Sequence, residues 1–244
     1  MEYLYKYKSG TNDDINALQK DSLWVSTYEN MNDPMEYPIY VTDKSVTDND
    51  IDEYKEKIMS LNCCISFSTS PSVKRLWNYY TNGFKGMVIA YTYQEIKDAL
   101  IKNKVKTFTE DKVVYDGKKY EIFKGQIKGK TSSNTDPFFH KDDSWKEEKE
   151  YRFVFEYKQS SKYYQQANGF LLNNIKPHHI FIGYKINKAN KAKLIDYCKT
   201  NDIYLYEMKP NNRSKNCADY NKKTLVAKKS KLEKEGNIYP SIIK

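Results

Sequence analysis

The fold of this chain is best approached from residues 142–155, which read DDSWKEEKEYRFVF. A charged run passes here into a strand pattern in which aromatic and apolar residues alternate with charged ones. Because successive side chains of a strand point to opposite faces, Glu150 and Arg152 are predicted on one face and Tyr151 and Phe153 on the other. The pattern therefore puts a carboxylate and a guanidinium at the point where a strand enters the fold.

Two interpretations of Glu150 stay open. In the first, Glu147 to Lys149 are solvated loop charges, and Glu150 and Arg152 pair with neighbours at the strand end. Paired or perturbed charges are often merely structural. In the second, Glu150 is a catalytic carboxylate, and the rest of the sequence has to supply its pocket.

The size and composition of the chain indicate one folded domain with a tail. The 244 residues are predicted to form a single α+β domain over 1–208 and a basic C-terminal tail over 209–244. Only 39% of the residues are hydrophobic, but 23 are tyrosines. Tyrosine rings bury area while their hydroxyls need partners, so this composition favours a groove with a polar rim.

The positive charge gathers in the predicted tail. Residues 209–244 contain ten lysines and arginines against three acidic residues, which accounts for seven of the chain's net charge of +9. Such a tail can hold a phosphate backbone or an acidic protein partner by long-range attraction. It can also be a solvated segment that serves solubility, because nothing in it resembles a folded nucleic-acid reader.

The cysteines and the N-terminal sequence exclude several classes of protein. The four cysteines form no CxxC pair and have no histidine at ligand spacing, so no structural zinc and no metal cofactor are expected. Residues 1–7 lack the apolar run of a signal peptide, and no stretch approaches membrane-spanning length. A cytoplasmic protein without membrane contact is the expectation.

Hydrophobic periodicity predicts the regular elements. Strands are expected at residues 3–7, 23–26, 63–68, 86–91, 113–115, 150–155, 178–183 and 203–208. Helices are expected after Thr11, over 50–61, after a cap at Ser72, over 94–102 and after a cap at Asn187, with a long loop between 120 and 143. The prediction is an α+β fold with a mixed, mostly antiparallel sheet and flanking helices.

Most familiar catalytic arrangements are missing. The nine glycines form neither GxGxxG nor a P-loop, and the three histidines do not allow a three-histidine metal site. No nucleophile-elbow sequence surrounds Ser66 or Ser68. Polar residues on predicted core strands remain: Lys6, Ser66, Ser68, Glu148, Glu150 and Arg152.

Two further features have a structural and a functional interpretation. Trp77 and Tyr80 follow Val73 and Leu76 at helical spacing, so they are either core residues or the wall of a ligand pocket. The stretch Asn32-Asp33-Pro34-Met35-Glu36 predicts an ordered turn with polar side chains.

A series of short motifs resembles a bacterial family catalogued as domain of unknown function 2971. In chain order they are Tyr5-Lys6-Tyr7, Leu23-Trp24-Val25-Ser26, Asn32-Asp33-Pro34-x-Glu36, Ile65-Ser66-Phe67-Ser68, Leu76-Trp77-x-x-Tyr80, Gly86-x-Val88-Ile89, Val113-Val114-Tyr115 and Trp145-x-x-Glu148-x-Glu150-Tyr151-Arg152. The resemblance is spread over about residues 3 to 208. The family name conveys no activity.

A more distant resemblance is to the ADP-ribosyltransferase fold, in particular its DNA-modifying toxin branch. It implies NAD as co-substrate, Glu150 with Glu148 as the catalytic carboxylates, and an NAD site made of Tyr5, Lys6, Tyr7, Ser66, Ser68, Trp77 and Tyr80. Asn32, Asp33, Glu36 and Arg152 would be further polar residues of the site. The transferase pattern has Arg or His on the first strand, where this sequence has Lys6.

Three functions follow as hypotheses. The first is transfer of ADP-ribose from NAD to a nucleic acid or protein, in phage defence or a toxin system with a protein partner or antitoxin. The second is a non-catalytic nucleotide or nucleic-acid binding module, with a tyrosine-rich groove and the basic tail. The third is a metal-dependent nuclease that uses Asp33, Glu36 and Glu150, whose spacing matches no known metal motif.

Overall fold

The computed structural model describes residues 3–28, 31, 33, 36–129, 135–156 and 169–209, and the backbone of 222–227. The strands are β1 (Tyr3–Lys8), β2 (Ser22–Thr27), β3 (Ile39–Tyr40), β4 (Asn62–Ser68), β5 (Met87–Thr92), β6 (Thr109–Lys112), β7 (Val114–Tyr115), β8 (Tyr120–Glu121), β9 (His140–Lys141), β10 (Glu150–Glu156), β11 (Gly169–Asn173), β12 (His179–Gly183), β13 (Tyr204–Lys209) and β14 (Lys222–Ala227). The helices are α1 (Asn12–Gln19), α2 (Asp48–Leu61), α3 (Lys74–Tyr79), α4 (Tyr93–Lys102), α5 (Lys124–Ile127) and α6 (Lys188–Asn201), with 3-10 turns η2 (Asp136–Phe139) and η3 (Asp143–Glu148).

Local capping explains where the longer helices begin. Thr11, Thr47 and Thr92 each accept a hydrogen bond from a backbone N–H three residues on, and the acidic residue there bonds back to the cap, so α1, α2 and α4 all start with a capping box. Asn187 caps α6, as predicted. The predicted cap at Ser72 is wrong, because α3 starts after Val73 without a side-chain cap.

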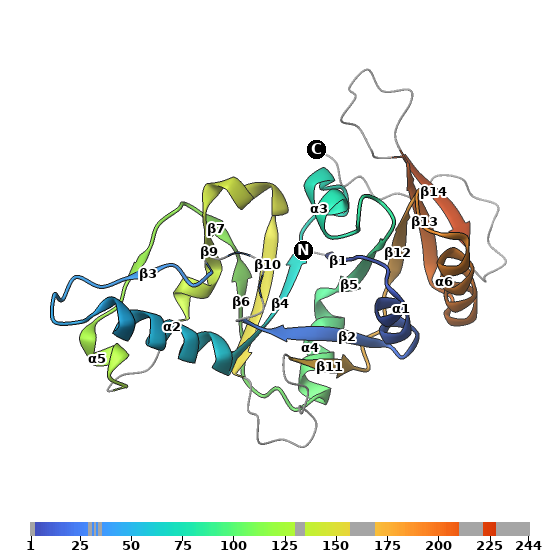
Figure 1. The fold of residues 1–244 in the computed structure, drawn as a ribbon. Coiled ribbons are helices and arrows are strands. Elements are labelled where there is room, and N and C mark those ends of the chain that lie inside the picture. Colours follow the sequence, from blue (N-terminus) through green and yellow to red (C-terminus); the bar gives the residue numbers. More distant parts are fainter. Residues whose placement is uncertain are drawn as a thin grey trace.

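One large sheet organises the molecule (Figure 1). Its strands run in the order β11, β2, β4, β1, β5, β12, β13, β14, and β10 pairs with β4 and β6. All pairs in this sheet are antiparallel except β12 and β13, which α6 connects as a parallel pair. The predicted α+β class, with a mixed and mostly antiparallel sheet, is confirmed.

The main core lies on one face of this sheet. It joins Leu4, Ile65, Ile89 and Phe153 from the strands to apolar residues of α1, α4 and α6. These positions alternate with residues of the opposite face, as period-two strands require. The three helices therefore cover one face and leave the other for smaller clusters.

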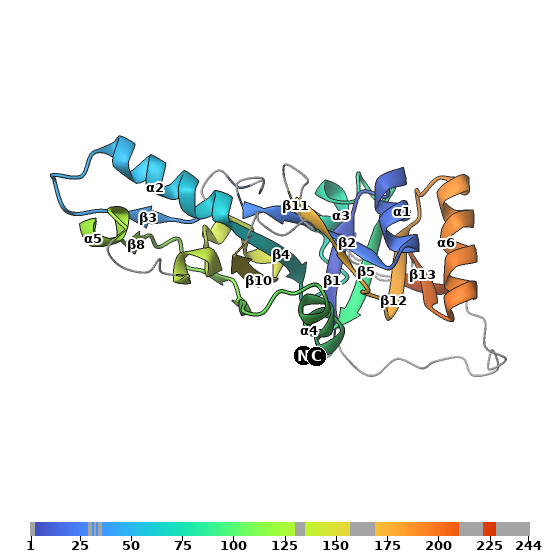
Figure 2. The same ribbon diagram turned by 90° about the horizontal axis from the view of Figure 1, so that it is seen from below.

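The opposite face carries two separate apolar clusters with a polar strip between them. Tyr28, Tyr54 and Phe138 belong to one cluster, which packs below α2, whereas Trp77 of α3 belongs to the other. In Figures 1 and 2, α2 with α5 and β3 lies at one end of the molecule, and α1 with α6 lies at the other. The strip between the clusters is the place where polar side chains of the central strands can meet.

The register of the strands explains why polar side chains gather in the strip between the two apolar clusters. Glu150 lies opposite Ser68, and Arg152 lies opposite Ser66, so these side chains share one face of the β4 and β10 pair. Strands β1 and β4 have one paired position in the described structure, Tyr5 opposite Ser68. The predicted alternation of β10 is therefore confirmed, and it brings the first strand next to the acidic residues.

Two stretches have more structure than the sequence predicted. The expected loop between 120 and 143 contains β8, α5, η2 and β9, and residues 130–134 lie outside the described part. Within the predicted tail, β14 pairs with β13, so the sheet continues past residue 208. Most of the predicted tail lies outside the described residues.

Among the helices of the described residues, none is long and apolar enough to cross a membrane.

Candidate functional site

A pocket of about 270 Å³ opens on the polar strip. Its volume is near the lower end of ligand sites, which span about 300–1,000 Å³. The lining residues are Tyr5, Lys6, Tyr7, Ser26, Met31, Asp33, Glu36, Ser66, Phe67, Ser68, Leu76, Tyr80, Lys141, Trp145, Glu148 and Glu150. Three segments far apart in the sequence, around residues 6, 67 and 149, therefore converge on one hollow.

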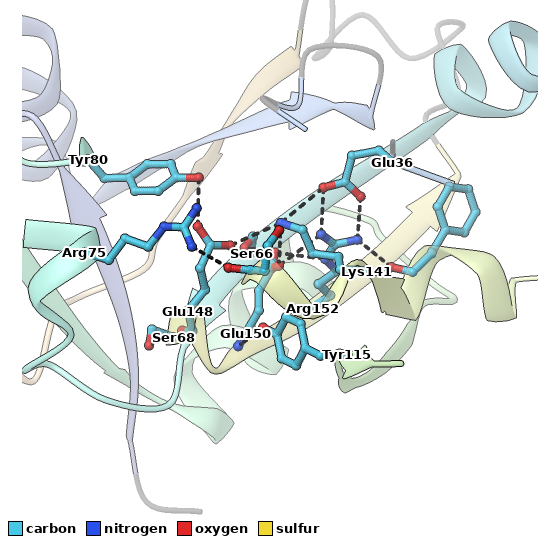
Figure 3. A network of polar contacts seen from close by, with 12 residues as sticks. Glu36, Ser66, Ser68, Arg75, Tyr80, Tyr115, Lys141, Glu148, Glu150 and Arg152 are labelled. Carbon is cyan, nitrogen blue, oxygen red and sulfur yellow. Dashed lines mark hydrogen bonds and ion pairs between the residues drawn. The ribbon is translucent and has the colours of Figure 1, made fainter. Parts of the chain in front are cut away.

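Arg152 has no exposed surface and does not line the pocket, but it binds two carboxylates that do. Its Nε and Nη2 donate to the two oxygens of Glu150 at 2.8 and 3.0 Å. Its Nη2 and Nη1 donate to the two oxygens of Glu36 at 2.8 and 2.9 Å, and Nη1 also reaches the Phe138 carbonyl and the Tyr28 hydroxyl. Figure 3 shows this fork between the two carboxylates. The Nε, Nη1 and Nη2 atoms of Arg152 all donate to acceptors of the protein itself. The guanidinium therefore holds Glu36 and Glu150 in place.

Lys141 is the second buried cation among the described residues, and it is not one of the site residues predicted from the sequence. Its Nζ lies 3.1 Å from Glu148, 3.3 Å from Glu150 and 3.5 Å from Glu36. Burial by itself would lower the pKa of Lys141, but the attraction of these carboxylates outweighs it and raises the pKa. The ammonium therefore stays charged and links three acidic side chains.

Glu150 is held as a carboxylate. Only 4% of it is exposed, and burial would raise its pKa. The positive charges of Arg152 and Lys141 and the hydroxyl of Ser66, which donates to its Oε1, lower the pKa to about 2 instead. Each oxygen of Glu150 thus has two partners inside the protein.

Glu148 lies in a different environment although it is two residues away. Its Oε2 pairs with Lys141, and its Oε1 accepts from the Tyr80 hydroxyl at 3.3 Å. Burial raises its pKa. Lys149 between the two glutamates has a left-handed backbone, with φ of 50°, and this turn ends η3 so that Glu148 enters the pocket from beside the strand. The two carboxyls therefore have pKa values shifted in opposite directions.

Most of the other predicted site residues line the pocket, and Asn32 and Trp77 are the exceptions. Tyr5, Lys6, Tyr7, Ser66, Ser68, Tyr80, Asp33 and Glu36 line the pocket together with both glutamates. Ser68 donates to the Glu148 carbonyl at 2.7 Å, and the Tyr7 hydroxyl donates to the Ser70 carbonyl at 2.9 Å, so both also fix the backbone around the site. Asn32 lies outside the described residues.

Trp77 does not line this pocket, so the structure favours the core interpretation of its helical spacing. The indole is fully buried, stacks on Phe84 at 5.1 Å and donates to the Pro71 carbonyl. Helical spacing is typical of core packing, and the packing of α3 onto the sheet puts Trp77 in the core.

Trp145 takes the place expected for an aromatic wall. It lines the pocket, and the Lys141 ammonium and the Arg75 guanidinium each lie 4.7 Å from its ring centre. Trp145 belongs to a motif that the sequence shows, whereas Lys141 has no local pattern that predicts a site residue, because it lies in a stretch with the composition of a loop. Pairing of β7 with β9 places Lys141 opposite Tyr115. The Tyr115 hydroxyl accepts a hydrogen bond from the Glu150 backbone N–H, so this pairing holds Lys141 near the acidic residues.

Among the described residues, no group of three or more acidic, histidine or cysteine side chains could hold a metal ion. Glu36 and Glu150, which the nuclease hypothesis required as ligands, both bind Arg152. The arrangement is that of a buried ion-pair network.

Fold and site together define an α+β protein with a pocket built on buried carboxylates, and part of the chain is similar to a known family. Residues 76–153 match the model of the family described as Protein of unknown function (DUF2971). This part runs from α3 to β10 and includes Tyr80, Lys141, Glu148, Glu150 and Arg152, so the match supports that resemblance. No curated protein and no solved structure matches the chain. The relationship to ADP-ribosyltransferases stays a prediction.

Proposed function

We propose that the pocket binds NAD and that the protein transfers ADP-ribose from it to a nucleic acid or protein acceptor. The observation that supports this proposal best is the convergence of Lys6, the Ser66 hydroxyl and the two glutamates on one pocket. The resemblance to ADP-ribosyltransferases requires these three segments to meet. A hollow of about 270 Å³ is suited to the ribose and nicotinamide end of the dinucleotide.

The proposed reaction places charge where the pocket can stabilise it. When the bond between C1′ of the ribose and the nicotinamide nitrogen breaks, nicotinamide leaves with the electron pair and positive charge develops on the ribose. Carboxylates that are already ionised and oriented stabilise such charge without reorganisation. Glu150, held ionised by Arg152 and Lys141, meets this condition.

Glu148 would complete the transfer. The acceptor attacks C1′ and must lose a proton, and a carboxylate with a raised pKa is the better base. The Tyr80 hydroxyl, bonded to Glu148, lies where it can orient either the ribose or the acceptor. A pair of carboxyls with opposite pKa shifts fits one electrostatic and one acid–base role.

Glutamine substitutions test this proposal. Glu148→Gln and Glu150→Gln are each expected to lower the release of nicotinamide from NAD by about 100-fold or more, the usual loss when one electrostatic stabiliser is removed. Glu147→Gln is the matched control, because Glu147 is an exposed neighbour. Thermal unfolding of each variant separates loss of activity from loss of fold. Unchanged turnover in folded Glu150→Gln would exclude the mechanism.

A non-catalytic nucleotide-binding pocket is the second candidate, and one observation favours it. Glu150 has two protein partners on each oxygen, which leaves it little capacity to contact a substrate. In that case NAD or another nucleotide would protect the protein from thermal unfolding, while no nicotinamide would be released. The two measurements on wild-type protein decide between the candidates.

A further inference from the structure

The pocket contains two lysines whose surroundings differ sharply. Lys141 lies within 3.5 Å of three carboxylates. Lys6 has no ion pair with any described residue, and its Nζ makes one hydrogen bond, to the Ser66 carbonyl at 2.7 Å. The charge of Lys141 is thus balanced by carboxylates, while Lys6 in the same pocket has no counter-ion among the residues that the structure describes.

The surroundings of Lys6 make its amine easier to deprotonate than that of an ordinary lysine. Its Nζ lies 5.8 Å from the Phe67 ring centre, and burial lowers its pKa to about 8. The charge of Lys8 lowers the pKa further, whereas Cys64, Glu150 and Asp14 raise it without offsetting the burial. A neutral amine has a lone pair, and only one of its hydrogens is engaged by Ser66.

Lys6 can also be reached. The residue keeps partial exposure and lines the pocket, so a ligand in the pocket can approach it. Desolvated lysines of this kind act as nucleophiles toward carbonyl compounds. The other pocket groups, among them Ser66, Tyr80 and Glu148, are hydrogen-bonding partners suited to a hydroxylated ligand.

We propose that Lys6 is a nucleophilic amine that forms a Schiff base with the aldehyde carbon of an open-chain sugar in this pocket. The amine nitrogen attacks the carbonyl carbon to give a carbinolamine. The carbonyl oxygen then leaves as water with both amine hydrogens, and a carbon–nitrogen double bond remains. Glu148 lies in the same pocket, and its carboxyl group can transfer a proton from the amine nitrogen to the oxygen that leaves as water. This inference goes beyond ADP-ribose transfer and does not require NAD.

Reductive trapping tests the inference on the wild-type protein. The protein is incubated at pH 7 with ribose 5-phosphate and sodium cyanoborohydride, and the adducts are located by peptide mass spectrometry. At pH 7 an amine with a pKa near 8 is about one-tenth neutral, and an ordinary lysine less than about one-thousandth, so Lys6 should be labelled roughly 100-fold faster than exposed lysines. Ribitol 5-phosphate, which has no carbonyl group, should give no adduct.

Two further measurements sharpen the result. The labelling rate of Lys6 should rise through about pH 8, whereas exposed lysines should need a pH above about 10. Lys6→Arg should lose the fast adduct, and Lys8→Arg on the same strand, where Lys8 pairs with Asp14, should keep it. Even labelling of all lysines, or the pH dependence of an ordinary lysine at Lys6, would overturn the proposal. Neither result depends on whether NAD is turned over.

Discussion

At the scale of single residues, the pKa of each glutamate in the site is decided by its burial and by the cations that it contacts. Arg152 and Lys141 hold Glu150 ionised, while Glu148 two residues away has its pKa raised by burial. The sequence predicted both glutamates and Arg152 as a group, but their pairing depends on Glu36 and Lys141, which come from distant segments.

The ionisation of Glu150 predicts how stability changes with acid. Its pKa is lowered from 4.5 to about 2, so its contribution is present above pH 4.5 and is lost as the pH falls from 4.5 to 2. The loss should reach about 3 kcal/mol, at 1.36 kcal/mol per pKa unit. Urea unfolding at a series of pH values should show a smaller acid loss in Glu150→Gln than in the wild type. Glu147→Gln should follow the wild type, and equal acid loss in all three would contradict the assignment.

At the scale of elements, one backbone turn places the two glutamates. Lys149 ends η3 in a left-handed conformation, with φ of 50°, and β10 begins at the next residue. Local pattern predicted the strand and its two faces correctly, because its alternation is strong. It gave no sign of the turn, since lysine has no preference for this conformation.

Substitutions at Lys149 test the importance of this turn. Lys149→Asn should leave the free energy of unfolding within about 0.5 kcal/mol of the wild type, because asparagine tolerates the left-handed region. Lys149→Val should lower it by about 1–2 kcal/mol or more, because a β-branched side chain is strained there. Chemical denaturation measures both. Equal stability of the two variants would mean that the turn is absent in solution.

At the scale of the whole molecule, the last part of the chain belongs partly to the sheet. Strand β14 pairs with β13 from Lys222 to Ala227, inside the stretch that composition marked as a tail. Repeated lysines and a short apolar run concealed this strand, because neither gives a clear period. The pairing with β13 is long-range information that the local sequence does not contain.

Two truncations separate the strand from the charge that follows it. A chain that ends at residue 227 should keep its thermal midpoint, whereas a chain that ends at 209 should unfold at a lower temperature, because β13 becomes an open edge. If the basic residues after 227 bind phosphates, the first truncation should also weaken binding to a single-stranded oligonucleotide and flatten its salt dependence. Equal midpoints of both truncated chains would show that β14 contributes no stability.

The sequence by itself determined the α+β class, the faces of the strands and the helix starts at Thr11 and Asn187, because these depend on period and capping within a few residues. It also indicated the polar residues that meet in the pocket. Only the tertiary structure decided that Lys141 joins them, that Trp77 is buried and that Lys6 has no counter-ion among the described residues. These outcomes depend on contacts between segments tens of residues apart, where packing and strand register, rather than local preference, choose the neighbours.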